Sequence, residues 1–586
     1  MKVKSHIRSS LAAFYFGKIA DPRQFSYLVD EHAAKGRWLT VSSRSFDRPV
    51  CPTPAMVNLM PPKWDVIVVG AGHNGLTAAA YLAQHNYNVL VLERRNEVGG
   101  CASTVTALGT RVNICNCDHS MVFESGIIEE LSLEDQGLRY LHLDPVKHFR
   151  VIEDTGTTRP WWLFKSTEQT LEAVAQCHPG SEAHYKNYLR EALPIAKFFL
   201  EFTSKPPSFS SALRSSSVCP KTATHLLKLR RLSADQALRN WFPQEALRAP
   251  AASSTAVWGT SPLAPGTGLA SLGYALGHLA PTARPVGGSG ALTNSLAKAI
   301  SAAGGIVRTG VEVTSIVCDL TGVRKVLLTN GEELPTEAVI TTIDPKTTIL
   351  SLLSSPPTRS VKALTNRWLK APKRSGYESK IDAVVDRPPD FGEEDRRLSK
   401  TLGVHQPSGT TTITTPSTSL IGDAHRQALA GKITSQPIFL SNTPGLLDKT
   451  MDPLDVGHTF SLEVLYTPYH LQGGWEKSSE PNRWLEVFSS HTDNEFLSGV
   501  RRWRALTPVD YEREFSLDQG YAPSYPGTTL DVILGRKREI TRYDTPVKGL
   551  YLAGSGTFPG AGIWGASGRN AAWRVMEHFH KKRMER

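Results

Sequence analysis

The sequence predicts an α/β fold built on a buried parallel sheet and interrupted by an inserted domain. Three units, near the beginning, the middle and the end of the chain, each combine a glycine turn with a following helix and neighbouring strand formers. A length of 586 residues implies about two to four domains, because single hydrophobic cores stop growing well below that size. Hydrophobic residues make up 40% of the chain and charged residues 21%, as in a globular protein.

The first unit lies at residues 65–93. A continuous apolar run over 65–69 is typical of a parallel strand that is buried on both faces. The glycine turn Gly70-Ala71-Gly72-His73-Asn74-Gly75 follows it, then helix formers over 76–83 and a second apolar run over 89–92. That second run ends in Glu93. A dinucleotide-binding turn is predicted by this order of elements within about 30 residues: a strand, the G-x-G-x-x-G turn, a helix, a second strand and an acid.

Each position in this turn has a physical reason. Gly70 permits the tight turn, Gly72 lets the backbone approach a pyrophosphate, and Gly75 lets the helix pack on the strand. The free N–H groups and the positive dipole end of the helix then face the phosphates. Glu93 can accept hydrogen bonds from both ribose hydroxyls of the adenosine half, and its charge would repel the 2′-phosphate of NADP.

The two other units repeat this pattern. Near the end of the chain, a strand over 549–553 leads into Gly554-Ser555-Gly556-Thr557, and helix formers follow over 566–579. In the middle, a glycine-rich turn at 285–290 opens a helix that runs to about residue 303, and strands are expected at 311–317, 326–328 and 338–342. A helix start after a glycine turn is again a site that favours an anion.

After Glu93 the chain continues Arg94-Arg95-Asn96-Glu97-Val98-Gly99-Gly100. This tail resembles the E-R-R-x-x-x-G-G signature of FAD enzymes of the glutathione-reductase and amine-oxidase type. Further stretches are SPLAPGTG at 260–267, GGSGAL at 287–292, YTPY at 466–469 and GLYLAGSGTFPGAGIWGASGRNAA at 549–572. With them the chain resembles the phytoene desaturase family of flavoproteins, the carotenoid and retinoid oxidoreductases.

The resemblance implies FAD as cofactor and a discontinuous, Rossmann-like FAD-binding domain with an inserted, mixed α+β substrate domain. In such families the paired glycines and the second glycine turn approach the flavin side of the cofactor, and the backbone at Val313 touches the adenine. Ser555 stands where an acid is frequent. The predicted FAD-binding domain comprises 64–160, 285–345 and 535–586, the substrate domain comprises 161–284 and 346–534, and residues 1–60 are an N-terminal extension.

The cofactor contacts that these motifs predict come from the two glycine turns, the acid that ends the second strand, the paired glycines and the middle unit. No residue is assigned as a catalytic acid or base. The predicted contacts are Gly70, Gly72, Gly75, Glu93, Arg94, Gly99, Gly100, Val313, Gly554, Ser555, Gly562, Ile563 and Trp564.

The family resemblance implies an FAD-dependent oxidoreductase that takes a hydride from a C–H bond of an apolar or amphipathic small molecule. The flavin would accept the hydride, and dioxygen or a quinone would reoxidise it. Two alternatives stay open. The segment 520–527 carries no histidine where a narrower group of the family has one, which agrees with a catalytically silent FAD-binding regulatory or interaction protein. A redox-neutral, flavin-dependent polyene isomerase is the other.

Metal and thiol chemistry have weak support in the sequence. Cys115, Cys117 and His119 alternate, so on a strand they would point to one face, but a fourth ligand for a soft metal is not visible. Small cysteines on a buried strand are commoner, and we predict no metal site. The chain has no C-x-x-C pair. His73 is expected either to approach the flavin or a phosphate, or to make a local hydrogen bond at the helix start.

Charge and hydropathy limit the partners. The net charge of +11 is not gathered in one tract, so we predict no nucleic-acid partner. No apolar run approaches the roughly 18 residues that a membrane span needs, and the basic amphipathic stretch at 225–232 predicts at most peripheral membrane contact, or a solvated helix face.

Residues 1–20 are basic, serine-bearing and free of acids, which resembles a mitochondrial targeting segment and predicts the matrix. A start at Met56 or Met60, or an ordinary extension, would agree with a cytoplasmic protein.

Overall fold

Two eight-stranded sheets form the framework of the described part of the chain. The expectations for residues 1–60 lie outside it. The computed structural model describes residues 63–584 except 116, 154–155, 158, 204–219, 373–374, 493–494 and 524.

The first sheet has a parallel centre, as the buried apolar runs predict. Strand β1 pairs with β2 on one side and with β13 on the other, and β13 also pairs with β20 from the end of the chain. Val66 is opposite Val89 in one pairing and opposite Ala338 in the other, so the apolar runs are in register and fully buried. The strands of this sheet are β1 (Trp64–Val69), β2 (Val89–Leu92), β10 (Ile306–Arg308), β11 (Val313–Asp319), β12 (Gly322–Leu328), β13 (Glu333–Thr341), β14 (Leu353–Ser354) and β20 (Leu550–Leu552).

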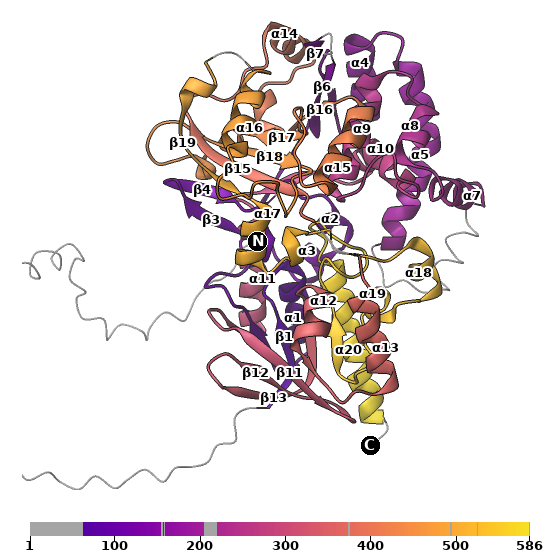
Figure 1. Ribbon diagram of the computed structural model, residues 1–586, viewed down its shortest axis with the longest axis vertical. Helices are drawn as coiled ribbons and strands as arrows, with labels where there is room; N and C mark the ends of the chain where they lie inside the picture. The colour runs from indigo at the N-terminus through magenta and orange to yellow at the C-terminus, as the bar shows by residue number, and fades with distance from the viewer. Residues whose placement is uncertain are drawn as a thin grey trace, which may run out of the picture. The chain divides into compact units, whose positions relative to one another are not determined.

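Three helices from distant parts of the chain pack together on this sheet. Helices α1 (His73–Gln84), α11 (Gly290–Ala302) and α20 (Ala566–Met584) share one apolar core with β1, β2 and β13 (Figure 1). The packing at the start of α1 is very close, because a Cβ atom at Gly75 would lie 2.0 Å from the carbonyl oxygen of Gly70. A Cβ atom at Gly568 of α20 would lie 1.9 Å from the carbonyl oxygen of Asn74. The glycine turn and both helices therefore form one unit.

The second sheet is mostly antiparallel and belongs to the inserted part of the chain. One of its faces is covered, with a large apolar core, by α4 (Thr167–Cys177), α5 (Glu182–Thr203), α8 (Ala234–Arg239), α9 (Glu245–Val257), α10 (Gly273–Leu279) and α15 (Thr418–Leu429) (Figure 1). Helix α16 (Glu480–Ser489) packs on the other face (Figure 1). Its strands are β6 (Lys147–Glu153), β7 (Gly156–Thr157), β8 (Trp161–Leu163), β15 (Glu378–Val385), β16 (Thr412–Pro416), β17 (Phe439–Asn442), β18 (His458–Leu465) and β19 (Val500–Leu506).

Sheet membership corrects two of the expected domain boundaries. The range 64–160 was expected in the FAD-binding domain, but β6 within it pairs with β16 and β8 of the second sheet. In the other direction β14, which falls in the range expected for the substrate domain, pairs with β11 of the first sheet. The pattern of apolar residues reveals a strand but not its partners, so the sequence assigned β6 and β14 to the wrong domains. The other boundaries stay predictions.

Two small hairpins and further helices complete the described structure. Strands β3 (Thr104–Ala107) and β4 (Thr110–Asn113) pair with each other, as do β5 (Tyr140–His142) and β9 (Ala283–Pro285). None of the helices in the described ranges has the length and apolarity to cross a membrane. The remaining α-helices are α2 (Met121–Glu124), α3 (Ile127–Glu130), α7 (Pro220–Leu229), α12 (Pro345–Thr347), α13 (Arg359–Leu369), α14 (Glu393–Thr401), α17 (Pro508–Phe515), α18 (Thr529–Leu534) and α19 (Arg538–Thr541).

Candidate functional site

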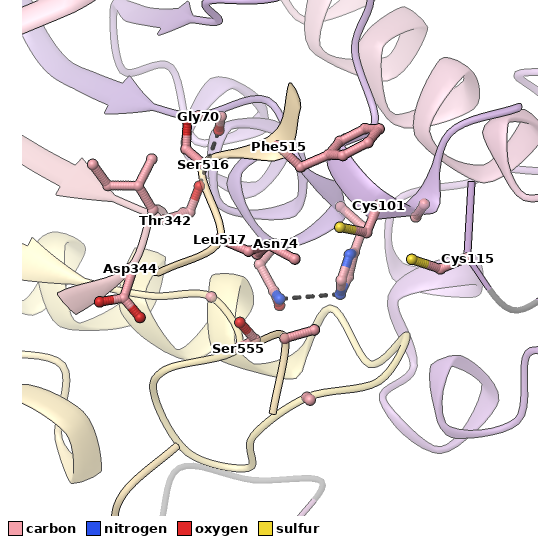
Figure 2. A pocket seen from close by; sticks show the side chains of 18 of the residues that line it. Gly70, Asn74, Cys101, Cys115, Thr342, Asp344, Phe515, Ser516, Leu517 and Ser555 are labelled. Atoms are coloured by element: carbon pink, nitrogen blue, oxygen red, sulfur yellow. Dashed lines mark hydrogen bonds between the residues drawn. The ribbon is translucent and has the colours of Figure 1, made fainter. Parts of the chain in front are cut away.

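A cavity with a volume of about 420 Å³ runs from the glycine turn after β1 to the second sheet. This volume is in the usual range of small-molecule and cofactor sites. Residues of both sheets and of the loop after α17 line it, and Figure 2 shows part of its wall.

The glycine turn presents the start of α1 to this cavity. Gly72 is the residue that precedes α1, no side chain caps the helix, and its first turn contains no acid. A Cβ atom at Gly72 would meet no atom within 4 Å, so the backbone there borders open space. The N–H groups of a helix start need acceptors, and a pyrophosphate supplies them together with a favourable charge. This part of the wall fits the phosphates of a dinucleotide.

Glu93 stands beside this turn at the end of β2. Its side chain accepts hydrogen bonds from the backbone N–H groups of Ala71 (2.8 Å) and Arg95 (2.9 Å), one on each carboxylate oxygen. Each oxygen keeps acceptor capacity, so the carboxylate can also bind ribose hydroxyls. The N–H of Val311 donates to the Glu93 carbonyl (2.8 Å), which places the start of β11 and Val313 at the same end of the cavity.

A segment of the inserted domain covers this end, and the sequence did not reveal it. Residues 514–517, at the end of α17 and beyond, line the cavity, and Figure 2 shows Phe515, Ser516 and Leu517 at its edge. Arg94 donates a hydrogen bond to the carbonyl oxygen of Arg513 (2.9 Å), and the Arg95 guanidinium lies 4.5 Å from the centre of the Phe515 ring. The two arginines after Glu93 therefore hold the inserted domain over this end of the cavity.

The second glycine turn forms the opposite wall, where Gly554, Ser555, Gly562 and Ile563 line the cavity. His73, at the start of α1, lies close to Asn74, with 3.0 Å between the His73 Nε2 and Asn74 Nδ2 atoms. Burial lowers the pKa of His73 to about 4, although a hydrogen bond with the Gly562 backbone opposes the shift. His73 is therefore neutral at pH 7, and it lines the cavity while it links the two glycine turns.

Two of the predicted contacts do not reach the cavity. The Trp564 indole N–H donates to the carbonyl of Ala561 (2.7 Å), and the ring packs under Gly562 instead of lining the wall. Gly75 packs against Gly70 and also lies behind the wall. The structure brings the other predicted residues together in one cavity wall: Gly70, Gly72, Glu93, Arg94, Gly99, Gly100, Val313, Gly554, Ser555, Gly562 and Ile563.

The wall that the second sheet contributes holds two buried carboxyl groups to which no sequence motif points. Glu378 of β15 and Glu463 of β18 line the cavity and are 7% and 6% exposed. Burial raises the pKa of both, and the neighbouring Glu378 adds to the shift of Glu463, whose pKa rises to about 8. Lys380 is close, but it is paired with Asp382. The pair therefore retains a proton at neutral pH.

The alternating cysteines and histidine do not converge on a common point. Cys117 contacts Asn442 (3.7 Å) and Asp118, and His119 is hydrogen-bonded with Tyr140 (2.9 Å) and Ser289 (3.1 Å). Cys115 lines the cavity instead. Among the described residues, no group of three or more His, Cys, Asp or Glu side chains could hold a metal ion.

The fold and this cavity are those of a flavin-dependent oxidoreductase. The family model described as flavin containing amine oxidoreductase matches residues 75–421, which is more than half of the chain, and the chain belongs to this family. The family implies FAD, and the glycine turn, Glu93 and the uncapped start of α1 fit it.

Known proteins similar to this chain include three relatives that align over most of its length. Pyridine nucleotide-disulfide oxidoreductase domain-containing protein 2 of Rattus norvegicus is 29% identical, over 93% of this chain and 99% of that protein. One of the limonene dehydrogenase subunits of Castellaniella defragrans is 25% identical over 88% and 94%, and phytoene desaturase (lycopene-forming) of Pantoea ananas is 24% identical over 86% and 96%. The resemblance to the phytoene desaturase family is confirmed.

A solved structure confirms the predicted fold class. Cyclohexylamine oxidase from Brevibacterium oxydans superposes with a TM-score of 0.56 at 15% identity, over 89% of this chain and all of that one. At this identity the likeness concerns the fold alone.

Replacing Glu93 by Gln tests the adenosine end of the site. Glu93→Gln removes a charged acceptor, so we expect the dissociation constant of FAD to rise by at least about 10-fold, since a hydrogen bond to a charged group contributes about 1.5–3 kcal/mol. Fluorescence titration of the apoprotein measures it. Glu97→Gln, an exposed neighbour outside the cavity wall, is the matched control. Equal affinity of both variants would contradict the assignment.

The buried acid Glu463 makes stability depend on pH in a defined direction. Between its ordinary pKa of 4.5 and about 8, the folded protein holds a proton that the unfolded chain has released. The free energy of unfolding therefore falls as the pH rises through this window. From about pH 5 to about pH 8.5, we expect the free energy of unfolding of the wild type to fall on the order of 2–4 kcal/mol more than that of Glu463→Gln. Urea unfolding at both pH values checks this, with the exposed Glu476→Gln as control. Parallel pH profiles of wild type and Glu463→Gln would be inconsistent with a buried, protonated Glu463.

Proposed function

We propose that the protein binds FAD along the cavity and dehydrogenates an apolar or amphipathic small molecule. The observation that carries this proposal is the change in the character of the cavity wall. One end offers an uncapped helix start and the Glu93 carboxylate, and the other offers apolar side chains of the inserted domain with two buried carboxyl groups.

The first end would hold the adenosine and the pyrophosphate. The backbone N–H groups at the start of α1 would bind the phosphates, Glu93 would bind the ribose, and the start of β11 at Val313 would contact the adenine. The loop at 514–517 would keep water from this end because Arg94 holds it in place. When bound, the flavin supplies the acceptor for a hydride.

The other end would receive the substrate. Val257 and Trp258 at the end of α9, Leu440 of β17, Leu465 of β18 and Ala522 line this region with apolar surface. Burial of such surface favours a substrate with little polarity, by roughly 25 cal/mol per Å². The limonene dehydrogenase and the phytoene desaturase are named for hydrocarbon substrates, which supports the same class here.

Glu378 is our candidate for the group that takes the proton from the substrate. Desaturation of a C–C bond removes a hydride and a proton, and the proton needs an acceptor in the cavity. The Oε1 atom of Glu378 is buried and has no hydrogen-bond partner among the described residues. Its raised pKa brings this carboxyl closer to the range in which a general base is effective. Dioxygen or a quinone would accept the electrons afterwards.

Anaerobic reduction of the bound flavin tests this function. We expect terpene or polyene hydrocarbons to bleach the visible flavin absorbance of the FAD-loaded protein and primary amines to leave it unchanged. Glu378→Gln should slow bleaching by about 100-fold, the usual contribution of a general base, with FAD affinity unchanged. Glu476→Gln is the control.

Bleaching by amines would contradict the substrate class. A photoreduced flavin that neither dioxygen nor a quinone reoxidises, in a protein that no candidate substrate reduces, would favour the silent FAD-binding role. Product formation only with reduced flavin, without consumption of an electron acceptor, would favour the isomerase.

A further inference from the structure

Cys101 and Cys115 lie near each other in the wall of the cofactor cavity (Figure 2). They are 14 positions apart in the chain, and the hairpin of β3 and β4 brings them together. Thr104 is paired with Asn113 in this hairpin, and the N–H of Ile114 donates to the Ser103 carbonyl (3.0 Å), which extends the ladder by one step. Cys115 follows Ile114 on one side of this open end, and Cys101 lies beyond Ala102 on the other side.

The exposure of these cysteines differs from that of the others in the described ranges. Cys101 and Cys115 are partly exposed and line the cavity, whereas Cys117, Cys177 and Cys318 are buried and lie outside its wall. Reagents that enter the cavity can therefore reach this pair and not the remaining described thiols.

The two thiols have unequal roles. The neighbouring Cys101 side chain, burial and the nearby Glu378 and Glu463 hold the pKa of Cys115 well above its ordinary value. A thiolate is the nucleophile in thiol chemistry, and the raised pKa of Cys115 disfavours its thiolate, so we assign Cys115 as the thiol that reacts second.

We propose that Cys101 and Cys115 are a redox-active thiol pair that hydrogen peroxide converts into a disulfide in the cavity wall. The Cys101 thiolate attacks one peroxide oxygen, the O–O bond breaks, and a sulfenic acid and hydroxide form. The hydroxide takes up the proton that Cys101 released and becomes water. The Cys115 sulfur then attacks the sulfenic sulfur, its proton leaves with the displaced hydroxide as a second water, and the disulfide forms. Two thiols and one peroxide thus give one disulfide and two waters.

The position of the pair gives this oxidation a consequence for the site. Cys101 follows the Gly99–Gly100 turn, and the N–H of Gly99 donates to the Ala71 carbonyl in the glycine turn (2.8 Å). Cys115 lies on the other side of the same open end of the hairpin, near Glu378 and Glu463. A disulfide would link the predicted flavin-binding turn covalently to the substrate side of the cavity.

Peptide mapping of the full-length, FAD-loaded protein tests this inference. Cys51 and Cys219, which lie outside the described residues, are first replaced by Ser. The protein is treated with a small excess of hydrogen peroxide, its free thiols are alkylated under denaturing conditions, and it is digested without reductant. We expect a peptide that joins residues 101 and 115, with the mass of two hydrogen atoms lost and two fewer alkylated thiols. A reductant should restore both thiols.

Three variants make the test specific. Cys101→Ser should abolish the joined peptide and leave Cys115 alkylatable, and Cys115→Ser should leave a sulfenic acid at Cys101 that a dione reagent traps. Cys117→Ser, a neighbour outside the cavity wall, should keep the joined peptide in full yield. An unchanged spectrum of the bound flavin shows that each variant is folded.

Persistence of both free thiols in the peroxide-treated protein, or disulfides that join other cysteines, would overturn the proposal. The test measures no turnover, so its outcome is independent of the proposed dehydrogenation.

Discussion

The close packing of the turn between β1 and α1 is the constraint on which the rest of the site depends. A Cβ atom at Gly75 would lie 2.0 Å from the Gly70 carbonyl, and one at Gly568 would lie 1.9 Å from the Asn74 carbonyl. Helix α1 can therefore come this close to β1 and to α20 only with glycine at both positions. Its first N–H groups then open into the cavity without a capping side chain, and an anionic ligand would satisfy them.

The inserted domain supplies further walls of the cavity that starts at this turn. It contributes the loop at 514–517 over the end of the cavity at Glu93, and the strands β15 and β18 with their carboxyl groups at the other end. A dinucleotide would thus lie between two domains that meet along it, with the polar contacts on the first sheet and the apolar contacts on the second. Glu378, the candidate proton acceptor, and its neighbour Glu463 lie in the wall that the second sheet contributes, and burial raises the pKa of both carboxyl groups.

The sequence predicted the parts of the site that depend on local order, and it missed the parts that depend on distant contacts. Strand β2, helix α1 and Glu93 lie where the motif predicts them, because spacing within about 30 residues determines this unit. Trp564 lies behind the cavity wall, and the motif does not show on which side of the turn an indole packs. No local signal marks Glu378 and Glu463, which lie in two strands of the second sheet, or the loop at 514–517. The positions of the two carboxyl groups follow from the pairing of β15 with β18. The position of the loop follows from the contacts of its segment with Arg94 and Arg95.

The most direct test of this account is the visible spectrum of the purified full-length protein, together with the mass of the ligand that heating releases. The account predicts the absorbance bands of an oxidised flavin and the mass of FAD, in nearly equal amounts of cofactor and protein. A colourless protein that takes up no added FAD would contradict it. The cavity would then be the remnant of a dinucleotide fold that has lost its cofactor.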